Sequence, residues 1–187
     1  MLGTELASKL SSHDLLLTGR SDLDISNENA VLNFCKQNKP DTVINSAAFT
    51  NVDACETEKD LAWMVNAWGC RNLALACSTV RSRLISISTD YVFEGDSSRP
   101  YHEFDVANGG KTVYGQTKFA GEQFIRQLCP NHLIVRIAWL YGRQKFRRYN
   151  AFSCREKFKR DKSCQRSNRQ SDKHVCSDIP HKRLITN

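Results

Sequence analysis

The chain has 187 residues, enough for one domain with a sizeable core, and its 40% apolar and 25% charged residues are ordinary for a globular protein. Its net charge of +7 is uneven, because residues 1–142 carry 13 Lys and Arg against 16 Asp and Glu, whereas residues 143–187 carry 14 against 4. Nucleic-acid binding is therefore not expected of the chain as a whole. No apolar run approaches the roughly 18 residues of a membrane span, and the N-terminus lacks a signal-peptide pattern, so we expect a cytoplasmic protein.

Eight cysteines are present, and five of them lie before residue 143 in segments with a helical pattern. No CxxC pair and no Cys/His spacing typical of a zinc finger occurs, so no metal site is expected. In a cytosolic protein we expect reduced, mostly buried thiols that act as small apolar groups: Cys35, Cys55, Cys70, Cys77 and Cys129.

Apolar runs and helical patterns alternate over the first 142 residues. In chain order they predict a strand at 15–17, a helix at 27–38, a strand at 42–45, a helix at 53–80, a strand at 84–88, a helix at 113–128 and a strand at 133–137. This order predicts an α/β fold with a parallel sheet between helices. Residues 143–187 show neither periodicity, so we expect one domain over 1–142 and a disordered basic tail.

The run Tyr114-Gly115-Gln116-Thr117-Lys118 places a phenol and an ammonium four residues apart, on one face of a predicted helix. Such a pair suits ketone reduction, because the phenol can protonate the forming alkoxide and a nearby cation lowers the phenol pKa from about 10. Thr89 follows a predicted strand, where ligands bind in open α/β sheets, and is placed to bind a substrate carbonyl. The alternatives are a surface Tyr with a solvated Lys, and a hydroxyl that satisfies loop backbone.

Six sequence blocks stand out in chain order: Pro40–Asp53 (PDTVINSAAFTNVD), Val65–Ala67 followed by Asn72–Ala74, Ser88–Phe93 (STDYVF), Pro100–Glu103 (PYHE), Val113–Glu122 (VYGQTKFAGE) and Trp139–Gly142 (WLYG). The same blocks occur in this order in dTDP-4-dehydrorhamnose reductases of the extended short-chain dehydrogenase/reductase family. Over about residues 2–142 the chain resembles this family. The resemblance implies a Rossmann-like, doubly wound sheet. It also implies NADPH- or NADH-dependent reduction of a nucleotide sugar, dTDP-6-deoxy-L-lyxo-4-hexulose, to dTDP-L-rhamnose for polysaccharide synthesis.

Carried over position by position, the resemblance implies roles for individual residues. Tyr114 would be the proton donor, Lys118 its pKa modulator and ribose contact, and Thr89 the hydroxyl that orients the carbonyl. Substrate contacts would be Thr89, Asp90 and Trp139. Cofactor contacts would be Gly3, Asp24, Ile25, Ala48, Phe49, Thr50, Tyr114 and Lys118. A loop cap at Asp24 and core packing at Trp139 are the structural alternatives.

Both ends depart from the family pattern. Gly3 would be the last glycine of the family's GxxGxxG turn, and the first strand and the first two glycines are absent. Without this central strand we expect a gap, with unpaired edges, between the strands near Leu17 and Leu84. After residue 142 the family pattern stops, as in a shifted reading frame. We therefore expect an inactive fragment, and Gly19-Arg20 mildly favours NADPH over NADH.

Three alternatives stay open from the sequence. One is another nucleotide-sugar epimerase or dehydratase, which shares the Thr/Tyr/Lys chemistry. A second is a non-catalytic binding subunit resembling the regulatory β subunit of methionine adenosyltransferase, which shares the fold. The third is a genuine basic tail that binds nucleic acid, ranked lower because no known nucleic-acid-binding fold accompanies its charges. The resemblance also allows a homodimer in full-length family members.

Overall fold

The structure, a computed structural model, describes residues 2–139 and 184–186. It divides into two compact units. The first comprises Met1–Gly95, Val106–Ala138 and His181–Asn187, and the second comprises Asp96–Asp105 and Trp139–Pro180. Among the helices that the structure describes, none is long and apolar enough to cross a membrane.

A five-stranded parallel sheet forms the centre of the first unit, with the strand order β1-β5-β2-β3-β4. The strands are β1 (Leu15–Leu17), β2 (Thr42–Asn45), β3 (Arg83–Thr89), β4 (His132–Ile137) and β5 (Leu184–Thr186). The first four confirm the strands predicted from the apolar runs, to within one residue at each end. β2 is buried along its whole length and β3 along most of it, as expected of strands covered on both faces.

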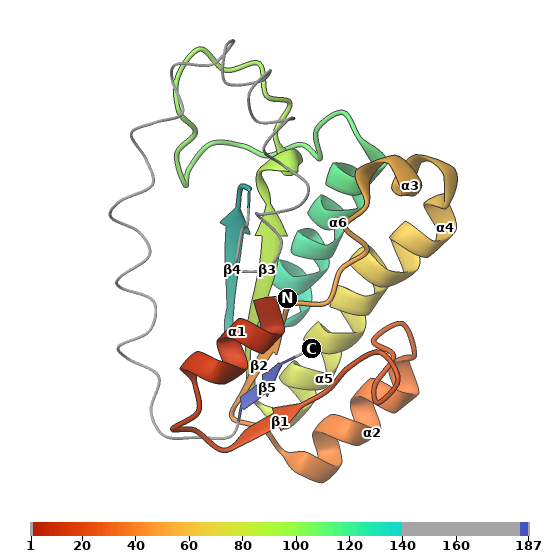
Figure 1. The fold of residues 1–187 in the computed structure, drawn as a ribbon, viewed down its shortest axis with the longest axis vertical. Coiled ribbons are helices and arrows are strands. Elements are labelled where there is room, and N and C mark those ends of the chain that lie inside the picture. The colour runs from red at the N-terminus through yellow and green to blue at the C-terminus, as the bar shows by residue number, and fades with distance from the viewer. Residues whose placement is uncertain (1, 140–183, 187) are drawn as a thin grey trace. The chain divides into compact units, whose positions relative to one another are not determined.

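Helices cover both faces of this sheet. They are α1 (Leu2–Lys9), α2 (Glu28–Asn38), α3 (Val52–Thr57), α4 (Lys59–Ala62), the π-helix η1 (Trp63–Trp68), α5 (Gly69–Val80), the 3₁₀ turn η2 (Asp90–Val92) and α6 (Val113–Leu128). The connections β1→β2, β2→β3 and β3→β4 all advance the same way across the sheet, so right-handed crossovers place their helices on one face. Figure 1 shows α2, α5 and α6 on that side and α1 on the other, which confirms the doubly wound arrangement.

The single helix predicted over 53–80 is wrong in detail, because this segment is broken into α3, α4, η1 and α5. The π-helical turn holds one residue more than an α-helical turn, and it places Asn66 and Ala67 in the interior. The spacing of apolar residues does not reveal the extra residue of a π-helical turn, since the segments before and after the turn each keep a helical period.

β5 lies between β1 and β2 in the sheet, and this position shows that two expectations from the sequence are wrong. Its residues pair in parallel with β1 on one side and β2 on the other. The prediction of a tail without regular structure is therefore wrong for Leu184–Thr186, while residues 143–183 and 187 lie outside the described residues. The expected gap between the strands near Leu17 and Leu84 is also wrong, because β5 pairs with β1 and β2, and β2 pairs with β3. The Leu184-Ile185-Thr186 run stands in a basic, polar segment without apolar periodicity, so its sequence did not indicate a strand.

The hydrophobic core lies between the sheet and α2, α5 and α6. Its buried members include Val31, Val43, Leu73, Leu84 and Ile125. The five cysteines of the described region are buried and free, which confirms the prediction of buried thiols. Burial raises the pKa of the Cys35 thiol to about 11. Within the same region, no group of three or more His, Cys, Asp or Glu side chains is arranged to hold a metal ion.

Candidate active site

The carboxyl end of β3 carries two linked hydroxyl groups. Thr89, the last residue of the strand, is buried, and its hydroxyl lies close enough to the Tyr114 phenol to lower the pKa of that phenol. The Thr89 hydroxyl also donates to Asp90 Oδ1 (3.1 Å) and accepts from the Tyr91 backbone N–H (3.2 Å). The structure therefore brings together Thr89, Asp90 and Tyr114, three of the residues that sequence predicted to form one site.

The start of α6 is built to hold Tyr114 at this position. Thr112 caps the helix by accepting from the Gly115 N–H at 3.0 Å, and Glu56 of α3 accepts from the Val113 N–H at 2.8 Å. Gly115 allows a close approach, because a Cβ there would lie 2.3 Å from the Tyr91 carbonyl oxygen. The Tyr114 ring packs edge-on against the Tyr91 ring, with 5.6 Å between centroids. The glycine inside the YxxxK run thus has a steric function.

Lys118 lies one turn further along α6 and is buried, with 4% of its surface exposed. Its Nζ donates to the Ile87 carbonyl oxygen of β3 at 2.7 Å. Burial lowers the pKa of Lys118, whereas Cys70 and Glu122 raise it. The Lys118 side chain therefore contacts β3 two residues before Thr89 and is not a solvated surface residue.

The pKa of Tyr114 departs from the direction expected from sequence. Burial raises it, the Thr89 hydrogen bond lowers it, and the negative charge of Asp90 raises it again. Lys118, whose ammonium donates to the Ile87 carbonyl, is not among the groups that shift this pKa. The predicted lowering of the phenol pKa by Lys118 is therefore wrong for this arrangement, in which Tyr114 is held as a neutral acid. Burial likewise raises the pKa of Asp90.

Two of the predicted cofactor residues have structural partners. Asp24 Oδ1 accepts from the Ser26 backbone N–H (2.9 Å) and hydroxyl (2.7 Å), so it does cap its loop. Ile25 is 4% exposed and packs against Gly69, where a Cβ would lie 2.6 Å from Ile25 Cδ1. The side chain of Ile25 thus packs in the core, and the contact of Asp24 and Ile25 with an adenine stays a prediction.

The remaining predicted cofactor residues lie in two places. Ala48, Phe49 and Thr50 form the loop that follows β2, at the same sheet edge as Thr89. Gly3 lies in the first turn of α1. Their roles toward a dinucleotide stay predictions.

Sequence reasoning missed Asn66, which is fully buried on η1 and ties the loop after β2 to α6. Asn66 Oδ1 accepts from the Phe49 N–H at 2.9 Å, and its amide nitrogen donates to the Phe49 carbonyl at 3.1 Å and to Thr117 Oγ1 at 3.2 Å. An Asn within an apolar helical pattern was the available signal, because a buried amide needs partners. Sequence also missed the buried Glu122 on α6.

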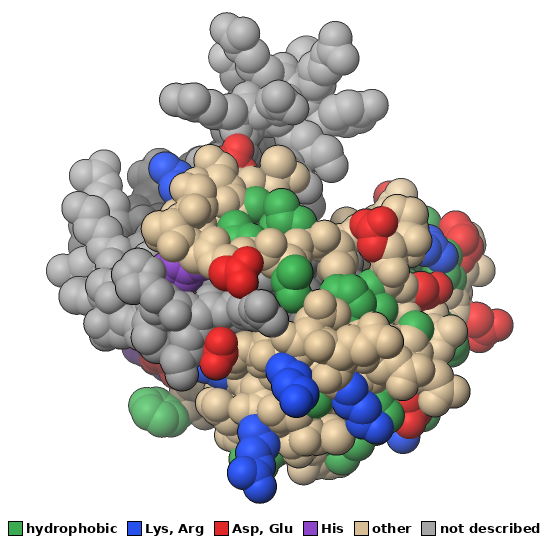
Figure 2. Space-filling view, turned by 90° about the horizontal axis from the view of Figure 1, so that it is seen from below, with side chains coloured by type: hydrophobic (Ala, Val, Ile, Leu, Met, Phe, Trp, Pro, Cys, Tyr) green, Lys and Arg blue, Asp and Glu red, His purple; other side chains and the backbone are tan. Residues whose placement is uncertain are grey.

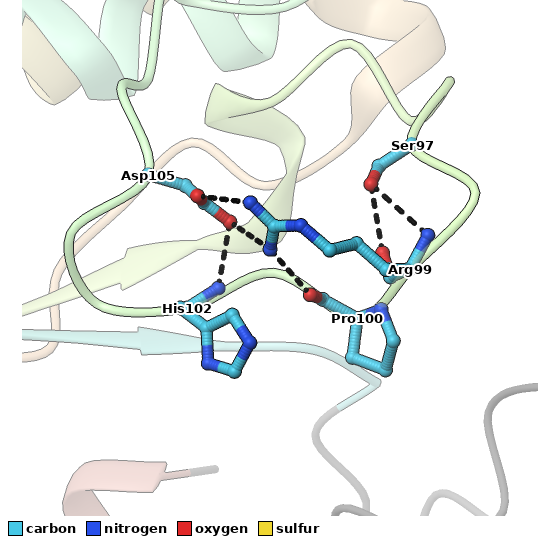
Figure 3. Close-up of polar contacts among 5 residues, drawn as sticks. All are labelled: Ser97, Arg99, Pro100, His102 and Asp105. Carbon is cyan, nitrogen blue, oxygen red and sulfur yellow. Dashed lines mark hydrogen bonds and ion pairs between the residues drawn. The ribbon is translucent and has the colours of Figure 1, made fainter.

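The second unit contains the block Pro100–Glu103. Figure 3 shows the Arg99 guanidinium facing the Asp105 carboxylate, with nitrogen–oxygen distances of 2.8 and 2.7 Å, and the His102 N–H donates to the same carboxylate at 2.8 Å. These bonds, with Arg99 first, lower the pKa of Asp105 to about 2. Trp139, the predicted substrate contact, belongs to this unit and has a left-handed φ of 52°. Its role therefore stays a prediction.

The charged side chains of the described residues are mixed. On the face shown in Figure 2, basic, acidic and apolar side chains are interspersed over the described part of the surface.

A doubly wound parallel sheet with a Thr/Tyr/Lys set at a strand's carboxyl end defines a Rossmann-like domain of the short-chain dehydrogenase class. The family described as "RmlD substrate binding domain" matches residues 1–163, past the boundary expected at residue 142. The chain belongs to this family.

Individual proteins similar to this chain are named as dTDP-4-dehydrorhamnose reductases. A dTDP-4-dehydrorhamnose reductase of Streptomyces griseus is 46% identical over 145 residues, which are 76% of this chain and 47% of the relative. The crystal structure of such a reductase from Clostridium acetobutylicum is 46% identical with a TM-score of 0.73, over 75% of this chain and 51% of that one. A Bacillus anthracis structure, solved in complex with NADP, is 41% identical with a TM-score of 0.73, over 76% and 51%. The chain thus spans about half the length of these relatives.

Proposed function

We propose that the protein to which these residues belong is an NADPH-dependent reductase of a nucleotide-sugar ketone. The proposed reaction is reduction of dTDP-6-deoxy-L-lyxo-4-hexulose at C4 to dTDP-L-rhamnose. The observation that carries the proposal is the interaction of the Thr89 and Tyr114 hydroxyls at the carboxyl end of β3, with Lys118 buried one turn further along α6. Two relatives, 46% and 41% identical to this chain, are named as a dTDP-4-dehydrorhamnose reductase and a dTDP-4-keto-6-deoxy-D-glucose reductase.

The residues present fit a dinucleotide laid across one edge of the sheet. Asp24 follows β1, Ala48–Thr50 follow β2, and Thr89 ends β3, so all three positions lie at the carboxyl ends of parallel strands. Dinucleotides bind at this edge in doubly wound sheets. Tyr114 and Lys118 would contact the nicotinamide ribose, and Asp24 would lie on the adenosine side.

The hydroxyl pair can carry the proton chemistry of a ketone reduction. Thr89 would donate a hydrogen bond to the substrate carbonyl oxygen and hold it near the Tyr114 phenol. When bound, NADPH supplies the hydride for the carbonyl carbon. Tyr114 then gives its proton to the oxygen as the C=O double bond becomes a C–O single bond. The raised pKa of Tyr114 keeps that proton on the phenol at neutral pH before the reaction.

The proposed function is tested in a chimera in which residues 2–139 replace the matching part of the Streptomyces griseus relative. Tyr114→Phe removes the proton donor and keeps the ring packing against Tyr91. Placed proton donors typically contribute about 10²–10⁴-fold, so we expect kcat to fall by that order with KM little changed. Kinetics with NADPH and the 4-keto sugar nucleotide measure this.

Tyr91→Phe is the matched control, because the Tyr91 ring is exposed at 38% and faces Tyr114 by its edge. We expect it to lower kcat much less than Tyr114→Phe. A chimera that reduces the ketone equally well with Tyr114→Phe would show that another group supplies the proton. In that case a non-catalytic binding role would explain the fold better.

A polypeptide of these 187 residues alone should bind NADPH negligibly. Its sequence holds only Gly3 of the family's three glycines, and those glycines let the backbone approach the pyrophosphate at a helix N-terminus. Isothermal titration calorimetry measures this, with the chimera as the positive control. A dissociation constant in the micromolar range for the 187-residue chain would contradict the proposal that it is inactive by itself.

A further inference from the structure

Three side chains of α6, spaced by four residues, bind consecutive residues of β3. The three contacts are Lys118 Nζ to the Ile87 carbonyl at 2.7 Å, Glu122 Oε1 from the Ser88 hydroxyl at 2.6 Å, and the Tyr114 phenol with the Thr89 hydroxyl. Two of these contacts involve residues of the proposed reduction. The third pair, Glu122 with Ser88, has no part in the mechanism, although it belongs to the same helix face.

Glu122 is 2% exposed and is held by charged partners from neighbouring elements. Arg136 of β4 donates from Nε to Glu122 Oε1 at 2.9 Å and from Nη2 to Oε2 at 2.6 Å. Arg126 of α6 is a weaker partner at 3.4 Å. A buried carboxylate is costly without such partners, and here they come from β3, β4 and α6 together. The carboxylate thus joins α6 to two adjacent strands.

Arg136 is itself held in place. Its guanidinium lies over the Phe93 ring, 4.9 Å from the centroid, and β4 is paired with β3 along its whole length. The two-pronged contact with Glu122 fixes the position of the carboxylate as well as its charge. Glu122 is therefore a fixed negative group one helical turn from the buried ammonium of Lys118.

We propose that Glu122 is a positioning residue that holds Lys118 in its charged form and in register with Tyr114. The proposal deepens the proposed function, from which it takes the role of Lys118. The described groups that bear on Lys118 are Cys70 of α5 and Glu122, and those that bear on Glu122 are Arg126 and Arg136. Glu122 is the carboxylate of this set, and it opposes the burial that lowers the pKa of Lys118.

The test follows the titration of Lys118 in the 187-residue chain and needs no turnover. Lysine Cε carbons are labelled with ¹³C, the Lys118 resonance is assigned by its loss in Lys118→Arg, and its chemical shift is followed with pH by NMR. Glu122→Gln keeps the size of the side chain and its acceptor for Ser88 but removes the charge. Because a neighbouring opposite charge favours the ionised form, we expect the Lys118 midpoint to fall by about one pH unit or more.

Glu28→Gln is the matched control, because it makes the same change in the exposed pair of Glu28 and Arg71, whose atoms lie 2.8 Å apart. It should leave the Lys118 midpoint unchanged. A double variant, Glu122→Leu with Arg136→Leu, separates positioning from packing, since apolar pairs often replace buried ion pairs without loss of stability. We expect the double variant to fold and its Lys118 midpoint to fall by less than in Glu122→Gln, because it also removes the positive charge of Arg136.

An unchanged midpoint in Glu122→Gln, together with a lower Tm, would overturn the proposal and leave Glu122 a structural residue. If Glu122→Gln does not fold, the double variant decides in the same way. The outcome is distinct from that of the chimera kinetics. A chimera that fails to reduce the ketone leaves the titration result standing, and an unshifted midpoint leaves the ketone reduction standing.

Discussion

Folding changes the pKa of Asp90, and this change can be measured through the pH dependence of the protein's stability. Its carboxyl lies beside Thr89 at the end of β3, and burial raises its pKa above the ordinary value of 3.8 although the Thr89 hydrogen bond lowers it. A carboxyl with a raised pKa in the fold destabilises the protein while it is ionised. This cost is present above the folded pKa and disappears as pH falls below the unfolded pKa.

Asp90→Asn should therefore raise the Tm at pH 7, and the gain should vanish as the pH is lowered toward 4. Circular dichroism melts at the two pH values measure this. Asp53→Asn is the control and should lower the Tm slightly at pH 7. Asp53 lies exposed in the first turn of α3, where a negative charge is favourable by about 0.3–1 kcal/mol. A lower Tm for Asp90→Asn at pH 7 would show that the Thr89 hydrogen bond outweighs the burial.

At this scale the sequence predicts which residues share a site but not what each contacts. Thr89 and Tyr114 meet as expected, because a strand end and a helix face are local properties. The partner of Lys118 is a backbone carbonyl 31 residues away, and no side-chain pattern marks a carbonyl. The raised pKa of Tyr114 follows first from its burial, which depends on the packing of elements distant in sequence, so it too was beyond the sequence.

The π-helix η1 is the element that shapes the loop beside the site. Its Asn66 uses one oxygen and one nitrogen to bind both backbone groups of Phe49, and it also donates to Thr117 of α6. The loop after β2 is thereby fixed to the helix that carries Tyr114. Helical spacing predicted the helix around Asn66, but the extra residue of the π-turn depends on these partners, which are distant in sequence.

Asn66→Leu should destabilise the chain, because it leaves the Phe49 N–H without its partner and the Phe49 carbonyl with only the Cys55 thiol, at 3.6 Å. Each unsatisfied buried polar group costs about 1–3 kcal/mol, so we expect a loss of roughly 2–5 kcal/mol in urea unfolding. Hydrogen exchange at the Phe49 amide should also become faster. Asn29→Leu, at an exposed position of α2, is the control and should cost much less. Unchanged exchange at Phe49 would show that the loop holds its shape without Asn66.

The whole sheet depends on a strand from the far end of the chain. The alternation of strands and helices was enough to predict the doubly wound α/β fold, since each element has its own apolar pattern. β5 was not predicted, because it stands in a basic, polar segment and is separated from its partners β1 and β2 by more than 130 residues of sequence. Its place in the sheet depends on backbone pairing with distant strands, which leaves no signal in the local sequence.

A chain that stops after residue 183 should therefore lose stability and aggregate. Without β5, the facing edges of β1 and β2 are left unpaired at the centre of the sheet, and unpaired parallel edges favour association. Several backbone hydrogen bonds are lost at about 1 kcal/mol net each, so we expect the Tm to fall by roughly 10 °C. A chain that stops after residue 186 keeps β5 and is the control. Ile185→Pro, which removes a ladder N–H at full length, should act in the same direction. Light scattering and thermal melts measure both effects, and equal Tm values with a monomeric shorter chain would show that β5 does not support the sheet.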